Sequence, residues 1–154
     1  MAKTFGGAVG KSEKGWMIGN YKLAISNTFD WMQPTASETG IFHFNEERVL
    51  RLPDGAISFA SCPAYENFAY ILGDNILCVQ GHPEQPLRAM NNFLAACKDE
   101  VPADETILAR KMIDSGIPDA SIWGEWMMRF FLKTVTEEVI AKLNKRVGFL
   151  AKSH

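Results

Sequence analysis

Two side chains that could act together in proton transfer stand two residues apart, at His82 and Glu84 in the segment Val79–Glu84. Pro83 between them has no N–H and biases His82 toward an extended conformation, so strand pairing should end here. A carboxylate bonded to an imidazole fixes its tautomer and stabilises the imidazolium formed when the ring accepts a proton. The pattern indicates the base and the orienting group of a nucleophilic triad, although a strand-ending turn with a solvated histidine has the same residues.

The elements that must position this pair change in character near residue 84. The chain has 154 residues, of which 47% are hydrophobic and 22% charged, as in one ordinary globular domain. No linker, repeat or low-complexity run divides it. We expect a single domain over 1–154, β-rich over 1–84 and helical over 85–154.

The β-rich part contains several short apolar runs separated by turn residues. Residues 1–5 should end a helix at a glycine cap, and the residues from Ala8 to Ile25 have a hairpin-like pattern. Residues 27–40 show no period and are expected to form a loop. Strands are expected over 56–60, 68–72 and 76–79. The last is apolar on both faces, which predicts a central strand carrying His82 at its carboxyl end, where open α/β sheets present ligand sites.

The helical part contains three segments with apolar residues at helical spacing. The first follows Pro86, the second covers residues 103–115 and the third covers about 121–145. The residues expected to be buried are Leu87, Met90, Phe93, Leu94, Cys97, Ile107, Leu108, Met112, Ile113, Trp123, Trp126, Met127, Phe130, Phe131, Val135, Val139, Ile140 and Leu143. The apolar stripe of the third segment requires a large packing partner.

Composition argues against several classes of partner. The formal net charge is -2, which gives no electrostatic case for nucleic acid or an anionic membrane surface. No apolar stretch reaches the roughly 18 residues of a membrane-spanning helix, and no signal peptide opens the chain, so we expect a cytoplasmic protein. Three widely spaced cysteines indicate neither a disulfide framework nor a zinc site. The glycine-rich segment 6–12 does not have phosphate-loop spacing.

Four segments resemble class I glutamine amidotransferase domains. Residues 73–84 are similar to their last strand and catalytic turn, and residues 2–11 to the helix and glycine turn after the nucleophile elbow. Residues 14–19 resemble the family's K-G-W-x-x-G stretch, and residues 49–56 its V-x-x-L-P-x-G-A. The branch that the chain resembles most includes stand-alone proteins such as γ-glutamyl peptidases. The resemblance implies an α/β fold, here an incomplete flavodoxin-like domain.

The resemblance also implies a chemistry, the hydrolysis of a γ-glutamyl amide through a cysteine thioester. His82 and Glu84 match the family's base and orienting residue. The family cysteine lies in a G-x-C-x-G-H-Q elbow just before the helix that residues 1–5 would complete, so we expect it upstream of Met1. The chain is then a fragment or has a misassigned start codon, and is inactive alone. The full-length parent would act on glutamine or a γ-glutamyl peptide, without cofactor or metal.

Other cysteines and histidines offer weaker alternatives. Cys78 and Cys97 lie at apolar positions, where thiols are normally inert, and Cys62 is the one expected to be exposed. Counting back from Val49 sets Asn45 on a family histidine that lines the substrate site, whereas His43 matches only with a two-residue insertion. A metal site from His43, His82 and Glu84 lacks ligand spacing.

A non-catalytic binding or assembly module is the rival interpretation. Without the strands that the family places before its elbow, the sheet should have an exposed edge. The expected consequences are self-association through this edge and marginal stability. The apolar stripe over 123–131 would be core in most proteins, but in this one it is also a candidate partner surface.

Overall fold

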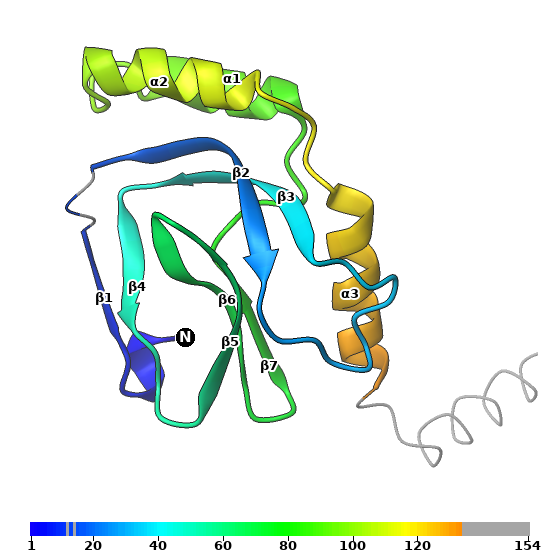
Figure 1. Cartoon of the computed structure of the whole chain (residues 1–154). Helices are drawn as coiled ribbons and strands as arrows, with labels where there is room; N and C mark the ends of the chain where they lie inside the picture. The colour runs from blue at the N-terminus through cyan, green and yellow to red at the C-terminus, as the bar shows by residue number, and fades with distance from the viewer. Residues whose placement is uncertain (12, 14, 134–154) are drawn as a thin grey trace, which may run out of the picture.

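A computed structural model describes residues 1–11, 13 and 15–133 of the chain (Figure 1). Strands fill the first part of the chain and helices the second, as expected. The elements in chain order are η1 (Lys3–Phe5), β1 (Ala8–Lys11), β2 (Met17–Ile25), β3 (Glu38–Asn45), β4 (Glu47–Arg51), β5 (Ala56–Cys62), β6 (Tyr65–Leu72), β7 (Ile76–Val79), α1 (Leu87–Ala96), α2 (Ala103–Ile113) and α3 (Ala120–Leu132).

The larger sheet has five strands in the order β3-β2-β5-β6-β7, and the smaller pairs β1 with β4. All pairings among these strands are antiparallel. The chain that leaves β7 returns to the far edge of the larger sheet, where Phe42 of β3 and His82 form an isolated antiparallel bridge. The sheet therefore curls until its two ends meet at one point, and the candidate catalytic turn forms that junction.

Two predictions about the strands were wrong. The hairpin expected between Ala8 and Ile25 does not form, because β1 pairs with β4, which lies more distant along the chain. β7 is not a central strand: among the described strands it pairs with β6 alone, and all four of its residues are partly exposed. Its apolar residues on both faces therefore belong to a sheet edge.

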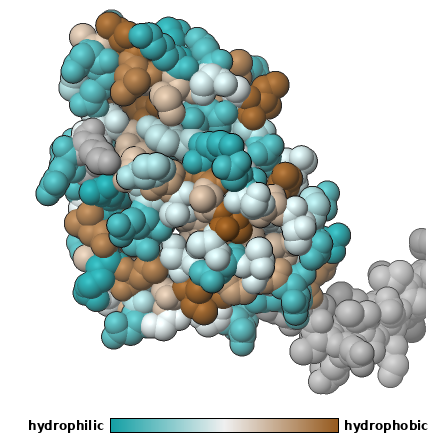
Figure 2. Space-filling model, in the orientation of Figure 1, coloured by the Kyte–Doolittle hydropathy of each residue, from teal (hydrophilic) through white to brown (hydrophobic). Residues whose placement is uncertain are grey.

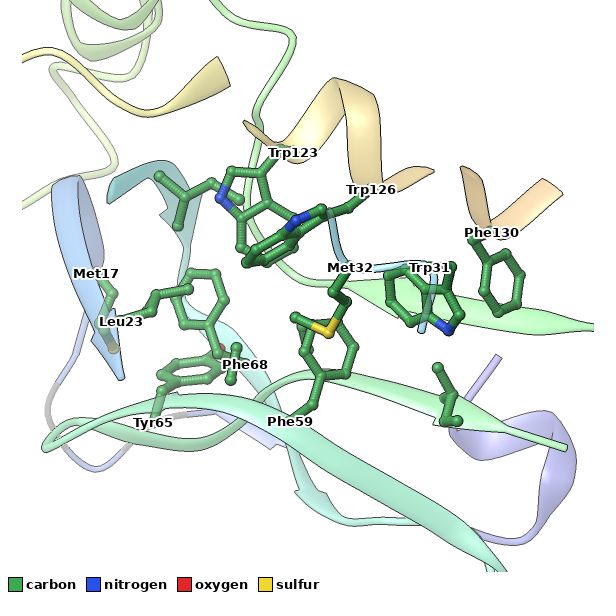
Figure 3. Close-up of a cluster of buried hydrophobic side chains, with 14 residues drawn as sticks. Met17, Leu23, Trp31, Met32, Phe59, Tyr65, Phe68, Trp123, Trp126 and Phe130 are labelled. Atoms are coloured by element: carbon green, nitrogen blue, oxygen red, sulfur yellow. The ribbon is translucent and has the colours of Figure 1, made fainter. Parts of the chain in front are cut away.

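Two apolar clusters hold the layers together. The larger lies between the five-stranded sheet and α3, and Figure 3 shows its aromatic side chains converging from strands, loop and helix. The smaller joins β2 and β3 to α1 and α2. The approach of α2 to β2 requires Gly19, whose φ is +139°, since an added Cβ would collide with Met112. Both clusters include residues of β2 and β3, and β3 also holds the candidate catalytic turn through Phe42.

The helices begin close to where the sequence predicts them, but their burial differs in part. Met90, Leu94, Ile113, Trp123, Trp126 and Phe130 are buried as expected. Leu87, Phe93, Ile107, Leu108 and Phe131 are exposed instead. α2 buries Ala109 and Ile113, so it contacts its neighbours with a narrower face than expected. Residues 135, 139, 140 and 143 lie outside the described residues.

The surface mixes polar and apolar side chains. Figure 2 shows apolar residues interspersed with hydrophilic ones on the face it displays. Within the described part of the chain, no helix has the length and apolar character needed to cross a bilayer.

Candidate functional site

The turn that carries His82 is fixed by its backbone. The His82 N–H donates to the Phe42 carbonyl oxygen at 2.6 Å, and the Gln85 N–H donates to the His82 carbonyl oxygen at 3.4 Å. Gly81 is required because a Cβ there would lie 2.8 Å from both the Phe42 carbonyl oxygen and Ile41 Cδ1. Pro83 then prevents further pairing because it has no N–H. These contacts place His82 where the two ends of the sheet meet.

The side chains of His82 and Glu84 are in direct contact, with 3.0 Å between Nδ1 and Oε1. An ionised carboxylate accepts hydrogen bonds only, so Nδ1 carries the proton and Nε2 of the neutral ring is left to accept another. The side chains are 37% and 59% exposed, so both remain accessible to solvent and substrate. The arrangement is that of an imidazole base oriented by a carboxylate.

The carboxyl group of Glu84 is held in its ionised form. Partial burial alone would raise its pKa, but the Glu84 N–H and the His82 and Gln85 side chains donate to it, and the net effect is a lowered pKa. The Gln85 contact is 3.2 Å from Nε2 to Oε1. A negatively charged Glu84 at neutral pH is what the stabilisation of an imidazolium requires.

His43 is fully buried inside the curled sheet, with its ring against Tyr21, Tyr65 and Phe68. Its Nδ1 donates to the Gln80 carbonyl oxygen at 2.8 Å, and its Nε2 has no hydrogen-bond partner among the described residues. Burial lowers the pKa of His43 to about 4, an effect that the bond to Gln80 opposes and the nearby His82 reinforces. His43 is therefore neutral near pH 7, and its ring is linked to the turn through the Gln80 carbonyl oxygen.

Asn45 lies at the end of β3, exposed, and pairs with Met17. It lines an open hollow of about 450 Å³ together with Met1, Ala2 and Gln80. The hollow lies beside the strand that leads to His82, but the His82 side chain does not line it. The proposed role of Asn45 in substrate binding remains a prediction.

The three cysteines are all partly exposed, so the expected contrast between an exposed Cys62 and two buried thiols is wrong. Cys78 faces Tyr70 on the neighbouring strand, and the two side chains form a hydrogen bond. Cys97 caps the end of α1 and packs against the smaller cluster. Cys62 ends β5. Each has a position in a strand or at a helix end, and none lies in a strand-to-helix elbow.

Two further features bear on the site. Among the described residues, no three His, Cys, Asp or Glu side chains are grouped so that they could hold a metal ion. A hollow of about 940 Å³ is lined by residues including Gly73 and Asp74, which precede β7, whereas His82 follows it. Neither His82 nor Glu84 lines this hollow.

Sequence reasoning found the His82–Glu84 pair but missed two groups that hold it. Phe42 contributes a backbone oxygen, which no residue type reveals. Gln80 anchors the start of the turn through its side-chain amide as well as its backbone. In the sequence, only its position directly before Gly81 and His82 pointed to such a role.

Comparison with known proteins gives a consistent result, although no protein-family model matches the chain. Gamma-glutamyl peptidase 4 of Arabidopsis thaliana is 33% identical over 89 residues, which cover 54% of this chain and 36% of the relative. Gamma-glutamyl peptidase 3 of the same plant is 22% identical over 136 residues, covering 83% and 54%. The chain thus spans about half, or less, of the length of these relatives.

Solved structures show the same fold. A glutamine amidotransferase from Thermotoga maritima superposes with a TM-score of 0.63 at 21% identity, covering 88% of this chain and 57% of its own. A glutamine amidotransferase from Methylobacillus flagellatus gives a TM-score of 0.64 at 20% identity, covering 86% and 57%. The described strands and helices correspond to part of a flavodoxin-like α/β domain. The chain is therefore similar in sequence to gamma-glutamyl peptidases, and it shares its fold with glutamine amidotransferases.

Proposed function

We propose that this chain carries the base and the orienting residue of a Cys-His-Glu triad that hydrolyses γ-glutamyl amides. The contact of 3.0 Å between His82 Nδ1 and Glu84 Oε1 carries the proposal, since it leaves Nε2 as the reactive nitrogen. The similarity to gamma-glutamyl peptidases supports glutamine or a γ-glutamyl peptide as the substrate class.

The proposed reaction has two halves. A cysteine thiolate attacks the γ-carbonyl carbon, and His82, as imidazolium, gives its Nε2 proton to the leaving nitrogen as the C–N bond breaks. Water then attacks the thioester while Nε2 takes its proton, and the thiolate leaves. Glu84 stabilises the imidazolium at each stage and keeps Nδ1 protonated. Neither half requires a cofactor or a metal.

We propose that the nucleophile of this reaction is a cysteine outside this sequence. It is then none of Cys62, Cys78 and Cys97. The chain alone should therefore show no glutaminase or γ-glutamyl peptidase activity. Reading the codons that precede Met1 for a G-x-C-x-G-H-Q elbow tests the source of the nucleophile. If the codons before Met1 encode no such elbow and the chain alone is active, this part of the proposal is wrong.

Labelling provides a direct test on the chain itself. A glutamine analogue with an electrophilic diazoketone should leave all three thiols unmodified, as read by intact mass and peptide mapping. Iodoacetamide is the control, because it should alkylate partly exposed thiols without recognition of the glutamyl group. Rapid, selective modification of one cysteine by the analogue, abolished in the His82→Ala variant, would identify that residue as the nucleophile and overturn the assignment.

An assembly module is the second candidate, favoured by the position of β7. β7 is an edge strand of the described sheet, with apolar, partly exposed residues and main-chain groups available on one side. Pairing with another polypeptide would cover this edge. Sedimentation analysis over a range of concentrations distinguishes the two states: self-association supports the module, and a concentration-independent monomer contradicts it.

A further inference from the structure

Gln80 is the residue with which the chain leaves β7, and it is hydrogen-bonded through all four of its polar groups. Its N–H donates to the Phe68 carbonyl oxygen at 3.0 Å, and its carbonyl oxygen accepts from His43 Nδ1 at 2.8 Å. Its side-chain Oε1 accepts from the Val49 N–H at 3.0 Å, and Nε2 donates to the Asn67 carbonyl oxygen at 2.5 Å. A single residue thereby connects three strands, β3, β4 and β6.

These connections lie immediately before the catalytic turn. Only Gly81 separates Gln80 from His82. The backbone of Gly81 packs closely against Phe42 and Ile41 of β3. The next anchor is the bond from the His82 N–H to the Phe42 carbonyl oxygen. β3 therefore holds the turn twice, through His43 on one side of Gly81 and through Phe42 on the other.

The imidazole of His82 depends on this backbone for its position. Its side chain is 37% exposed, and its hydrogen-bond partner Glu84 is 59% exposed on the same turn. Both side chains extend from one short, partly exposed turn, so the geometry of their contact depends on how firmly the backbone of that turn is held. The rigid reference must come from the buried groups next to the turn, because a displacement of about 1 Å costs a catalytic group much of its effect.

We propose that Gln80 is a positioning residue for His82, and that His43 supports it by donating to the Gln80 carbonyl oxygen. The inference rests on the proposed function of His82 and Glu84. Gln80 itself contacts neither side chain of the pair and acts through the backbone of the turn. Its side-chain amide joins the Val49 N–H of β4 to the Asn67 carbonyl oxygen of β6, so an apolar residue of similar size would leave both groups unpaired.

The tautomer of His82 provides a readout that general loss of stability does not change in a folded protein. We would record ¹⁵N chemical shifts of the ring nitrogens in ¹⁵N-histidine-labelled protein at neutral pH. The Nδ1–H form should predominate by about tenfold in the unmodified chain, because a hydrogen bond to a charged acceptor favours it. Gln80→Leu should reduce this ratio by about threefold or more, as His82 and Glu84 lose their fixed geometry.

The matched control is Tyr65→Phe, which removes the bond of 2.7 Å from the Tyr65 hydroxyl to the Glu47 carbonyl oxygen and keeps the ring beside His43. This variant should lose stability and leave the His82 tautomer ratio unchanged within about twofold. If Gln80→Leu does not fold, His43→Phe provides the same test, because it removes one of the four hydrogen bonds of Gln80 and leaves the other three.

The outcomes separate the two proposals. Glu84→Ala should abolish the excess of the Nδ1–H form; if it does not, or if the unmodified chain shows no excess, the proposed function loses its base and orienting pair. If the excess depends on Glu84 but survives in both Gln80→Leu and His43→Phe, the pair stands and the positioning role is overturned. An equal loss in the Tyr65→Phe control would also overturn it, since the effect would then follow any loss of a buried hydrogen bond.

Discussion

The buried histidine inside the curled sheet predicts a specific dependence of stability on pH. His43 is 0% exposed, and its pKa is about 4 in the folded protein against about 6.5 in an unfolded chain. Between these values the unfolded state binds more protons, so the free energy of unfolding rises with pH. The contribution is fully present above about pH 6.5 and is lost as the pH falls toward 4. For these two values, linkage gives a loss of about 2.5 kcal/mol between pH 7.5 and 4.5.

Urea unfolding followed by tryptophan fluorescence measures this loss, because Trp31, Trp123 and Trp126 are buried. Two variants of His43 remove the titration in different ways. His43→Asn places an amide donor near the position of Nδ1, and His43→Phe keeps an aromatic ring but leaves the Gln80 carbonyl oxygen unpaired. His43→Phe should be less stable than the unmodified protein by about 1–3 kcal/mol at pH 7.5, and this deficit should shrink or reverse at pH 4.5.

Both His43 variants remove the titrating imidazole, so their stabilities should depend on pH in the same way. Both should lack most of the pH dependence seen in the unmodified protein over this range, whereas His82→Gln should retain it because this variant keeps the buried His43. Ionisation of Glu84 belongs to a lower window, since its pKa is below the ordinary range. If either His43 variant loses as much stability between pH 7.5 and 4.5 as the unmodified protein does, His43 is not the source of this pH dependence.

Three further predictions concern packing and the contact between His82 and Glu84. Gly19→Ala should lower the free energy of unfolding by about 2 kcal/mol or more, because the added Cβ would collide with α2. Gly55→Ala should lower it by about 1 kcal/mol, because Gly55 has φ +78° but nothing lies within 4 Å of an added Cβ. Urea unfolding of the two variants separates the effect of collision from that of backbone strain. Phe59→Ala should lower the free energy of unfolding by about 3–5 kcal/mol in the same assay, since Phe59 is 0% exposed in the larger cluster. A loss of less than about 1 kcal/mol would contradict the packing described. His82→Ala should raise the pKa of Glu84, measured by ¹³C titration of its carboxyl group, and an unchanged pKa would show that the two side chains do not interact in solution.

The fold was predictable from sequence where contacts are local. Turn residues and short apolar runs marked β5, β6 and β7, and apolar spacing marked α1, α2 and α3. The pairing of β1 was not predictable, because its partner β4 follows it in the chain only after β2 and β3. Ile107 and Leu108 show the limit of periodicity: apolar spacing shows that a helix forms but not how wide a face its neighbours cover.

At the candidate site, too, local contacts could be predicted from the sequence and long-range contacts could not. His82 and Glu84 are two residues apart around a proline, so their contact follows from local geometry, and the structure brings them together. The groups that hold them do not follow from local geometry. The partners of Gln80 lie 12–37 positions away along the chain, and the burial of His43 depends on rings contributed by β2 and β6. Such contacts exist only once the sheet has curled.

The bridge between Phe42 and His82 has a consequence for how such a domain can vary. This bridge joins two segments that lie forty residues apart in the chain. The loops between these segments can therefore change in length or composition without moving the imidazole of His82. A rearrangement of β3, in contrast, would be carried directly to the imidazole of His82. Insertions in the connecting loops should therefore leave the His82–Glu84 contact in place, whereas changes in β3 near Phe42 should disturb it.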